Sequence, residues 1–380
     1  WYLPQGHLAT FRQPLRPEPL DLEAVLDGRG RLRLRPRFTA GESVLEWEDT
    51  VRLLADGFTR LEGEIVQAPD LHQFERAGFR RPHRGLGTGL VGDRLALVRL
   101  VAESRLRVTA GEPGLIMLAE VLLGEAPPPI PPPPGLRSVL RPYQQHGVAW
   151  LLSRYRIGIG ALLADDMGLG KTHQVMGLLC LIRAERPEAR TLVVCPRGVL
   201  EHWHHLLETF APDLPVHLFH GPGRSLEDAP ADGVVLTTYD IVIRSTGELA
   251  ASAWDVLALD EAQRIKNPRT KAARAVRKLP AAFRVALTGT PLENRLLELW
   301  SVVDLIVPGY LGSEREFREL YRNPSADQLG RLRERLAVLT LRRLKEQVLS
   351  DLPEKVEDLR YCTLSPTQRD LYASIHSTET

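Results

Sequence analysis

Short, uninterrupted apolar runs recur along the chain after residue 135, and longer stretches with helical spacing separate them. The runs cover residues 160–165, 191–195, 234–238, 255–260 and 283–288, and the helical stretches include 171–184, 199–210 and 270–278. A run without apolar/polar alternation suits a strand buried on both faces, as in a parallel sheet covered by helices. The order of strands and helices therefore predicts an α/β fold with a doubly wound parallel sheet, in which ligands bind beyond the carboxyl ends of the strands.

A different pattern marks the residues near the N-terminus. Asp27 and Gly28 form a turn signal, and residues 31–35 then alternate arginine with leucine, which predicts one strand of a hairpin with an arginine face. Two interpretations of the arginines stay open: contact with phosphates, or a charged sheet face that discourages aggregation. Short segments at 43–47 and 94–99 and a helix expected over 115–123 complete a predicted accessory domain. It spans residues 1–125, is small and mixed α/β or β-rich, and has no function that the sequence reveals.

A proline-rich stretch, APPPIPPPP, covers residues 126–134. Such a run cannot donate backbone hydrogen bonds and adopts extended polyproline II, which rises about 3.1 Å per residue. Residues 126–135 are therefore predicted to be a semi-rigid linker between two domains. A docking site for a proline-recognising module is the alternative.

Composition narrows the class of protein. A chain of 380 residues with 43% apolar and 26% charged residues is expected to be a soluble protein of two or three domains. The apolar stretch 114–124 contains Glu120 and is shorter than the roughly 20 residues that span a bilayer, so no membrane partner is expected. The chain begins at Trp1 without a visible signal peptide, which indicates a fragment or a processed chain.

Charge and cysteine usage add two expectations. The three cysteines are far apart in the sequence and form neither a disulfide framework nor a zinc pattern, which favours the reducing cytoplasm. The net charge of +1 does not by itself indicate a nucleic-acid-binding protein, although basic residues can still cluster on one face. Only six of the 49 basic residues are lysines, and Lys171 is the first along the chain.

That lysine lies in the stretch LLADDMGLGKTHQ, residues 162–174, where the usual phosphate-loop pattern would place glycine instead of Asp165. The stretch follows a predicted strand and opens a predicted helix, so its backbone N–H groups would face a phosphate chain. Gly168 and Gly170 allow the turn, Lys171 adds positive charge, and Thr172 offers a hydroxyl to Mg²⁺. The residues expected to contact the nucleotide here are Met167, Gly168, Leu169, Gly170, Lys171 and Thr172.

A second chemical motif ends another buried strand, in the sequence VLALDEAQRIKN, residues 256–267. A carboxylate at a strand end can hold Mg²⁺, and the next one can deprotonate an attacking water. Asp260 is therefore a metal ligand candidate and Glu261 a candidate base, with Lys171 as the third catalytic candidate. An acidic pair is also common at an ordinary helix start. Its position about 90 residues after the phosphate loop favours catalysis.

Eight blocks of sequence carry a family resemblance. They read LRPYQQHGVAWLL, LLADDMGLGKTHQ, TLVVCPRGVLEHW, VVLTTYD, LDEAQRIKNP, VALTGTPLENRLLELWSVVDLI, LRRLKEQVLSDLPEK and LSPTQRDLY. In order and spacing they resemble the first motor lobe of Swi/Snf-type ATPases and the start of the second. The resemblance implies a RecA-like P-loop ATPase lobe over residues 136–340, a connection to a second lobe over 341–380, and ATP and Mg²⁺ as cofactors.

The same resemblance implies roles for further residues. Gln144 is expected to contact the adenine base, and Thr288, Gly289 and Thr290 to couple the nucleotide site to DNA. Gln263 stands where many members have histidine; glutamine can hydrogen-bond toward the coupling motif but cannot carry a proton, which favours altered coupling over lost hydrolysis. The residues expected near the DNA backbone are Pro196, Arg197, Thr238, Lys266 and Asn267.

Two other stretches allow a functional and a structural interpretation. The sequence EHWHH, residues 201–205, contains a histidine cluster that suggests metal, but its spacing favours a helix face on which Trp203 packs. Residues 315–336 form a charge-rich helical stretch whose basic side would approach DNA or, more simply, face solvent.

Members of the family use ATP hydrolysis to move along double-stranded DNA, and many remodel protein–DNA complexes. We therefore expect an ATP-dependent DNA translocase or remodeller, bacterial, cytoplasmic and associated with the nucleoid. The chain ends before any motif of the second lobe, which normally supplies an arginine for phosphoryl transfer, so weak hydrolysis by these residues alone is expected. The alternative is a partner-binding module whose motor serves RNA polymerase or a DNA-defence complex. A small-molecule kinase is disfavoured because no acceptor site is visible.

Overall fold

The computed structural model describes residues 15–61, 64–82, 89–124, 126–289, 296–348 and 365–369. The chain divides into two compact units, residues 1–344 and 345–380. The first unit contains an N-terminal region (described from residue 15 to 124) and a central region (126–344). In the second unit the described residues form helix α14, Lys345–Val348, and a short helical turn at 365–369.

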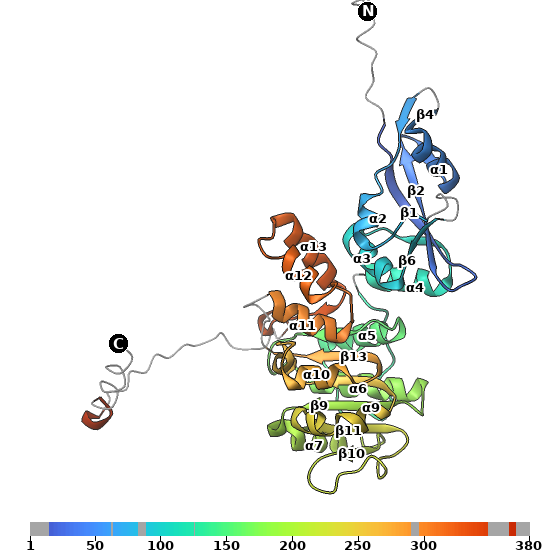
Figure 1. The fold of residues 1–380 in the computed structure, drawn as a ribbon. Coiled ribbons are helices and arrows are strands. Elements are labelled where there is room, and N and C mark those ends of the chain that lie inside the picture. The colour runs from blue at the N-terminus through green and yellow to red at the C-terminus, as the bar shows by residue number, and fades with distance from the viewer. Residues whose placement is uncertain are drawn as a thin grey trace, which may run out of the picture. The chain divides into compact units, whose positions relative to one another are not determined.

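The central region is built on a parallel sheet of seven strands (Figure 1). In spatial order its strands are β10 (Val216–Leu218), β11 (Gly233–Thr238), β9 (Arg190–Cys195), β12 (Trp254–Leu259), β13 (Ala281–Leu287), β8 (Ala161–Leu163) and β14 (Thr340–Leu341). Every neighbouring pair of these strands is parallel. The doubly wound sheet predicted from the apolar runs is confirmed.

Helices cover both faces of this sheet. They are α5 (Pro142–Arg156), α6 (Lys171–Glu185), α7 (Leu200–Phe210), α8 (Tyr239–Arg244), α9 (Thr246–Ala251), α10 (Lys271–Arg277) and α11 (Leu296–Ile306). Beyond them, α12 (Glu314–Leu320) packs against α11, and α13 (Ala326–Ala337) packs against α3 (Arg94–Ser104) of the N-terminal region and the edge strand β14. Successive strand residues enter opposite cores: Val193 packs with α5, α6 and α7, whereas Leu192 and Val194 pack in the core shared by α8 to α11. This two-sided burial explains why the strands lack apolar/polar alternation.

The charge-rich stretch 315–336 differs from the single helical stretch that its composition predicts. It forms two helices, because Pro324 follows the end of α12 and Ser325 begins α13. The hydroxyl of Ser325 accepts a hydrogen bond from the backbone N–H of Gln328, as an N-cap does. Most of the two helices is exposed, with Phe317 and Leu332 as their buried anchors.

The N-terminal region is a mixed α/β domain. Its main sheet has the order β3 (Ser43–Leu45), β2 (Leu32–Ala40), β1 (Glu18–Leu26) and β7 (Val108–Gly111), and β6 (Leu90–Gly92) pairs with β2. A smaller sheet joins β4 (Phe58–Leu61) to β5 (Glu64–Gln67). Its helices are α1 (Trp47–Asp56), α2 (His72–Ala77), α3 (Arg94–Ser104) and α4 (Pro113–Leu123). Segment 94–99 is thus helical, and strand β3 ends before Trp47.

The arginines of β2 are paired with carboxylates across the hairpin. Arg35 lies opposite Glu23 in the strand register and forms an ion pair with it at 3.3 Å. Arg37 binds Asp21 in the same way, with Nε donating to Oδ1 at 2.7 Å. Because these acids already neutralise the arginines, the structure favours a charged sheet face over a phosphate-binding surface.

Partly buried arginines join the two regions of the first unit. Arg99 of α3 donates to the backbone oxygens of Gly309 at 3.3 Å and Tyr310 at 3.1 Å. Glu103, also on α3, forms a mostly buried ion pair with Arg335 of α13. The division into an accessory domain, a linker and an ATPase lobe stays a prediction, because these contacts tie the regions closely together.

The proline-rich stretch lies against the central region. Ile130 packs beside the core that contains α5 and α6, as does Leu136. The backbone N–H of Arg137 donates to the oxygen of Phe210 at the end of α7, at 2.8 Å. The stretch therefore has one face on the central core and is not surrounded by solvent.

Candidate nucleotide-binding site

Three sequence motifs meet at one edge of the central sheet. The phosphate loop follows β8, the acidic pair follows β12, and Thr288 with Gly289 follows β13. Strand β13 lies between β8 and β12, so the three motifs are neighbours although they are far apart in sequence. This is the edge at which doubly wound sheets bind ligands.

The phosphate loop has the backbone geometry that its glycines predict. Gly168 has φ of 84° and Gly170 has φ of 71°, in the left-handed region that favours glycine. A Cβ at position 170 would lie 2.3 Å from Nε2 of Gln144, so the loop also needs a residue without a side chain there. Leu169 is fully buried between the two glycines and anchors the loop.

Lys171 opens α6, and its ammonium group is held inside the loop. Nζ donates to the backbone oxygens of Asp165 at 2.8 Å and Asp166 at 3.2 Å. Burial lowers the pKa of Lys171, and the carboxylates of Asp165, Glu261 and Asp260 oppose that shift by favouring the charged form. The site therefore holds a positive charge at the start of a helix, where a phosphate group would be stabilised.

Gln144 links the start of α5 to the same loop. Its Oε1 accepts from the backbone N–H of Arg141 at 2.9 Å, and its Nε2 donates to the backbone oxygen of Leu169 at 3.2 Å. The side chain thus lies beside the phosphate loop, where the family resemblance places it. Its contact with an adenine base stays a prediction.

Asp260 is held by donors on both of its carboxylate oxygens. Trp203 Nε1 donates to Oδ2 at 2.8 Å, and the backbone N–H of Glu261 donates to Oδ1 at 2.9 Å. Burial raises the pKa of Asp260, whereas the hydrogen bond from Trp203 lowers it. A carboxylate oriented in this way and close to Lys171 offers the oxygen ligand that Mg²⁺ prefers.

Trp203 has a role that the sequence did not reveal. The spacing of residues 201–205 predicts that it packs on a helix face, and the side chain is indeed only 1% exposed. Its hydrogen bond to Asp260 spans 57 positions of sequence and depends on how α7, which packs against β10 and β11, lies on the sheet. His204, on the same helix, faces Glu208 at 3.5 Å. Among the described residues no three His, Cys, Asp or Glu side chains form a metal-binding cluster.

Glu261, Gln263 and Thr288 form a chain of side-chain hydrogen bonds. The Gln263 amide donates to Glu261 Oε2 at 2.5 Å, and the Thr288 hydroxyl donates to Gln263 Oε1 at 3.1 Å. Glutamine therefore uses both ends of its amide to connect the candidate base to the end of β13. Glu261 itself has φ of 50°, a strained value for a residue other than glycine.

Gly289 lies against the phosphate loop. A Cβ at this position would lie 2.6 Å from Cγ of Met167 and 3.3 Å from Nζ of Lys171. Thr172 is the second residue of α6, one position beyond the lysine. Thr290, the last of the expected coupling residues, lies outside the part of the chain that the structure describes.

The residues expected near DNA occupy the same edge of the sheet, where Pro196 and Arg197 follow β9. Arg197 is exposed. Thr238 is buried at 2% exposure, and its hydroxyl caps α8 by accepting from the N–H of Ile241. Lys266 forms an ion pair with Glu298 at 3.1 Å, and Asn267 Oδ1 accepts from a backbone N–H of the following turn. Their contacts with DNA stay a prediction.

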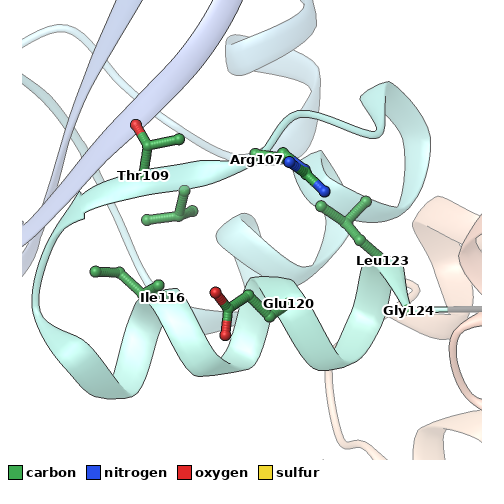
Figure 2. A pocket seen from close by; sticks show the side chains of 7 residues that line it. Arg107, Thr109, Ile116, Glu120, Leu123 and Gly124 are labelled. Atoms are coloured by element: carbon green, nitrogen blue, oxygen red, sulfur yellow. The ribbon is translucent and has the colours of Figure 1, made fainter. Parts of the chain in front are cut away.

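A separate hollow lies in the N-terminal region, between β7 and α4 (Figure 2). Its volume is about 370 Å³, and Glu120 points from α4 toward the strand that carries Thr109. None of its lining residues belongs to the nucleotide-site candidates. None of the described helices is long and apolar enough to cross a membrane.

Comparison with known proteins assigns the family. The SNF2-related domain matches residues 143–380. YwqA of Bacillus subtilis, whose name describes an ATP-dependent helicase/translocase, is 42% identical over 255 residues, which cover 64% of this chain and 28% of YwqA. The Zorya protein ZorD of Escherichia coli is 36% identical over 274 residues, 62% of this chain and 25% of ZorD. The chain thus spans less than a third of either relative.

Comparison with a solved structure supports the same family assignment. The SWI2/SNF2 ATPase core of Sulfolobus solfataricus in complex with dsDNA is 37% identical, with a TM-score of 0.56 over 66% of this chain and 54% of that one. The RecA-like lobe expected from the resemblance is therefore confirmed. With the family match, the parallel sheet and the motifs at its edge, the chain belongs to the SNF2-related family.

Proposed function

We propose that these residues form the first motor lobe, with an accessory region, of an ATP-dependent double-stranded DNA translocase or remodeller. The observation that carries the proposal is the meeting of Lys171, Asp260 and Glu261 beyond the ends of β8 and β12, the two strands that flank β13, beside a glycine loop of the required geometry. We further propose that the protein is cytoplasmic and associated with the bacterial nucleoid.

Each part of the site has a task in nucleotide hydrolysis. The backbone N–H groups of the loop and the Lys171 ammonium would bind phosphate oxygens. Thr172 and Asp260 would hold Mg²⁺, which neutralises phosphate charge when it is bound. Glu261, fixed by the Gln263 amide, would orient and deprotonate the attacking water.

We infer that ATP hydrolysis is coupled to DNA through side chains along this edge of the sheet. Gln263 connects Glu261 to Thr288, so a change at the candidate base reaches the end of β13 through two hydrogen bonds. The exposed Arg197 is available to DNA phosphates. The likeness to a core solved with dsDNA supports duplex DNA as the track.

The test is the ATPase activity of the whole protein with and without duplex DNA. We expect DNA to stimulate turnover, and Lys171→Ala and Glu261→Gln to abolish it. Lys278→Ala, at an exposed lysine after α10, is the matched control and is expected to act as wild type. Turnover that survives in either site variant would contradict the assignment.

Salt dependence tests direct contact with the DNA backbone. Each displaced phosphate counterion contributes about −0.9 to the slope of log affinity against log salt concentration. A slope of several units is expected. A slope near zero would exclude tracking along the backbone.

A second candidate is a motor that acts only with a protein partner, such as RNA polymerase or a DNA-defence complex. One relative is named for a protein partner, the TATA-binding protein-associated factor MOT1 of Saccharomyces cerevisiae, which is 35% identical over 276 residues. The accessory region, tied to the motor lobe by Glu103 and Arg335, would be the docking module. Turnover that responds to the partner but not to DNA alone would favour this candidate.

A further inference from the structure

Arg343 occupies a buried junction behind the phosphate loop. Its Nε donates to Asp165 Oδ1 at 3.0 Å, and its Nη2 donates to Asp165 Oδ2 at 2.5 Å and to Gln174 Oε1 at 2.7 Å. Asp165 and Gln174 are fully buried, and the Arg343 side chain is 11% exposed. A guanidinium that binds a carboxylate with two nitrogens fixes both groups in direction as well as in distance.

The backbone around Arg343 runs beside the strand that leads into the loop. Leu162 N–H donates to Leu339 O, Ala164 N–H to Leu341 O and Asp166 N–H to Arg343 O, at 2.8, 2.8 and 3.0 Å. The N–H of Arg343 returns a bond to Asp165 Oδ1 at 3.1 Å. The last residues of the first unit are therefore hydrogen-bonded along β8 and on to Asp165 and Asp166, at the start of the phosphate loop.

Helix α5 closes the junction from the other side. The Arg343 guanidinium lies 5.3 Å from the centre of the Tyr143 ring and also donates to the Tyr143 backbone oxygen. A Cβ at Gly147 would lie 1.9 Å from Gln174 Oε1 and 2.8 Å from Arg343 Nη2. Because glycine has no side chain, position 147 leaves space for the Gln174 amide and the Arg343 guanidinium.

Lys171 contacts the opposite side of the same two loop residues. Its ammonium binds the backbone oxygens of Asp165 and Asp166, whereas Arg343 binds the Asp165 carboxylate and the Asp166 N–H. A phosphate group that draws Lys171 toward itself would release these oxygens. Asp165 and Asp166 would then shift, and the shift would pass directly to Arg343, because the guanidinium group and the backbone of Arg343 are both hydrogen-bonded to these two residues.

We propose that Arg343, through Asp165, is a positioning residue that transmits the occupancy of the phosphate loop to the chain segment leaving the first unit after Leu344. The proposal rests on the nucleotide site described above. It assigns a task to Asp165, which stands where the usual loop has glycine. A buried ion pair adds little stability compared with apolar residues of the same volume, so a role in defining geometry fits it better.

The test uses the 380-residue chain and two measurements, the affinity for a fluorescent ADP with Mg²⁺ and hydrogen exchange of the backbone over residues 339–348. In the wild type, nucleotide is expected to change exchange in this segment by about fivefold or more. Arg343→Gln is expected to remove that response. Arg343→Lys keeps the positive charge but cannot bind the Asp165 carboxylate with two nitrogens, so it is expected to remove the response as well. Arg342→Gln, at the exposed neighbour, is the matched control and is expected to respond as wild type.

The outcomes separate this proposal from the proposed function. A wild-type chain that binds no nucleotide would overturn the nucleotide site and this proposal with it. Nucleotide binding without a change over 339–348, or a full change in Arg343→Lys, would overturn this proposal alone. A merely structural arginine would lower the unfolding temperature of its variants while every folded variant kept the nucleotide response. Arg343→Lys makes that distinction even when Arg343→Gln fails to fold.

Discussion

The indole N–H of Trp203 donates a hydrogen bond of 2.8 Å to Oδ2 of Asp260. Trp203 lies on α7 and Asp260 follows β12, so the bond joins a core helix to the edge that carries the candidate nucleotide site. The backbone N–H of Glu261 occupies the other oxygen. If Asp260 is the Mg²⁺ ligand that we propose, Trp203 and this N–H determine its orientation and its basicity.

Trp203→Phe is expected to weaken the proposed Mg²⁺ site while keeping an aromatic side chain in the buried position of Trp203. Loss of such a supporting bond costs about 10-fold or more in metal affinity or activity. The concentration of Mg²⁺ that gives half-maximal ATPase turnover of the whole protein is therefore expected to rise by about that factor. Trp300→Phe is the control, because Trp300 also donates its indole N–H, but to the backbone oxygen of Gly312, and it belongs to α11. Equal Mg²⁺ dependence in both variants would contradict the assigned role of Trp203.

Gly147→Ala is expected to destabilise the protein by about 1–3 kcal/mol, because the added methyl group would overlap the side chains of Gln174 and Arg343. Urea unfolding of the variant measures this loss. Gly330→Ala is the control, since no atom lies within 4 Å of a Cβ at this helical position, and alanine there is expected to gain up to about 1 kcal/mol. A Gly147→Ala variant as stable as wild type would show that the junction has free space.

Arg154 is a buried cation bound to backbone oxygens. It is 4% exposed, its Nε donates to Val338 O at 2.9 Å, and burial lowers its pKa to about 10. Arg154→Met would leave that oxygen without its donor and is expected to cost about 1–3 kcal/mol in urea unfolding. Arg156→Met, at the exposed end of the same helix, is expected to cost less than about 1 kcal/mol. Equal losses would show that the position of the charge is unimportant.

Cys180 and Cys195 are expected to resist alkylation in the folded protein. Burial raises the pKa of Cys180 to about 11 and that of Cys195 to about 12, so at pH 8 only about one Cys180 thiol in a thousand is ionised. Iodoacetamide labelling, followed by mass spectrometry in a Cys362→Ser background, is expected to be slow until denaturant is added. Rapid labelling at pH 8 without denaturant would contradict the buried placement of both thiols.

The same thiols contribute to the dependence of stability on pH. Their folded pKa lies above the unfolded value of about 9, so the unfolded chain loses protons first as the pH rises. Stability from this source is complete below pH 9 and is expected to fall as the pH rises from 9 toward 12. Replacement of both residues by alanine is expected to remove this component of the alkaline loss, which urea unfolding at pH 8 and pH 10.5 would measure.

Much of the site could be predicted because its signals are local. The continuous apolar runs identify strands buried on two faces, and a glycine-rich turn between a strand and a helix identifies the loop that holds Lys171. Asp260 and Glu261 follow a strand in the same way. These features depend on a few neighbouring residues, so the order of amino acids is enough to find them.

The sequence by itself thus determined the doubly wound sheet, the phosphate loop and the acidic pair. Only the tertiary structure decided that β13 lies between β8 and β12, that Trp203 holds Asp260 and that Arg343 binds Asp165. The last two contacts join residues 57 and 178 positions apart. The physical reason is that a hydrogen bond between such distant residues depends on strand order and helix packing, which no local pattern of apolar and polar positions specifies.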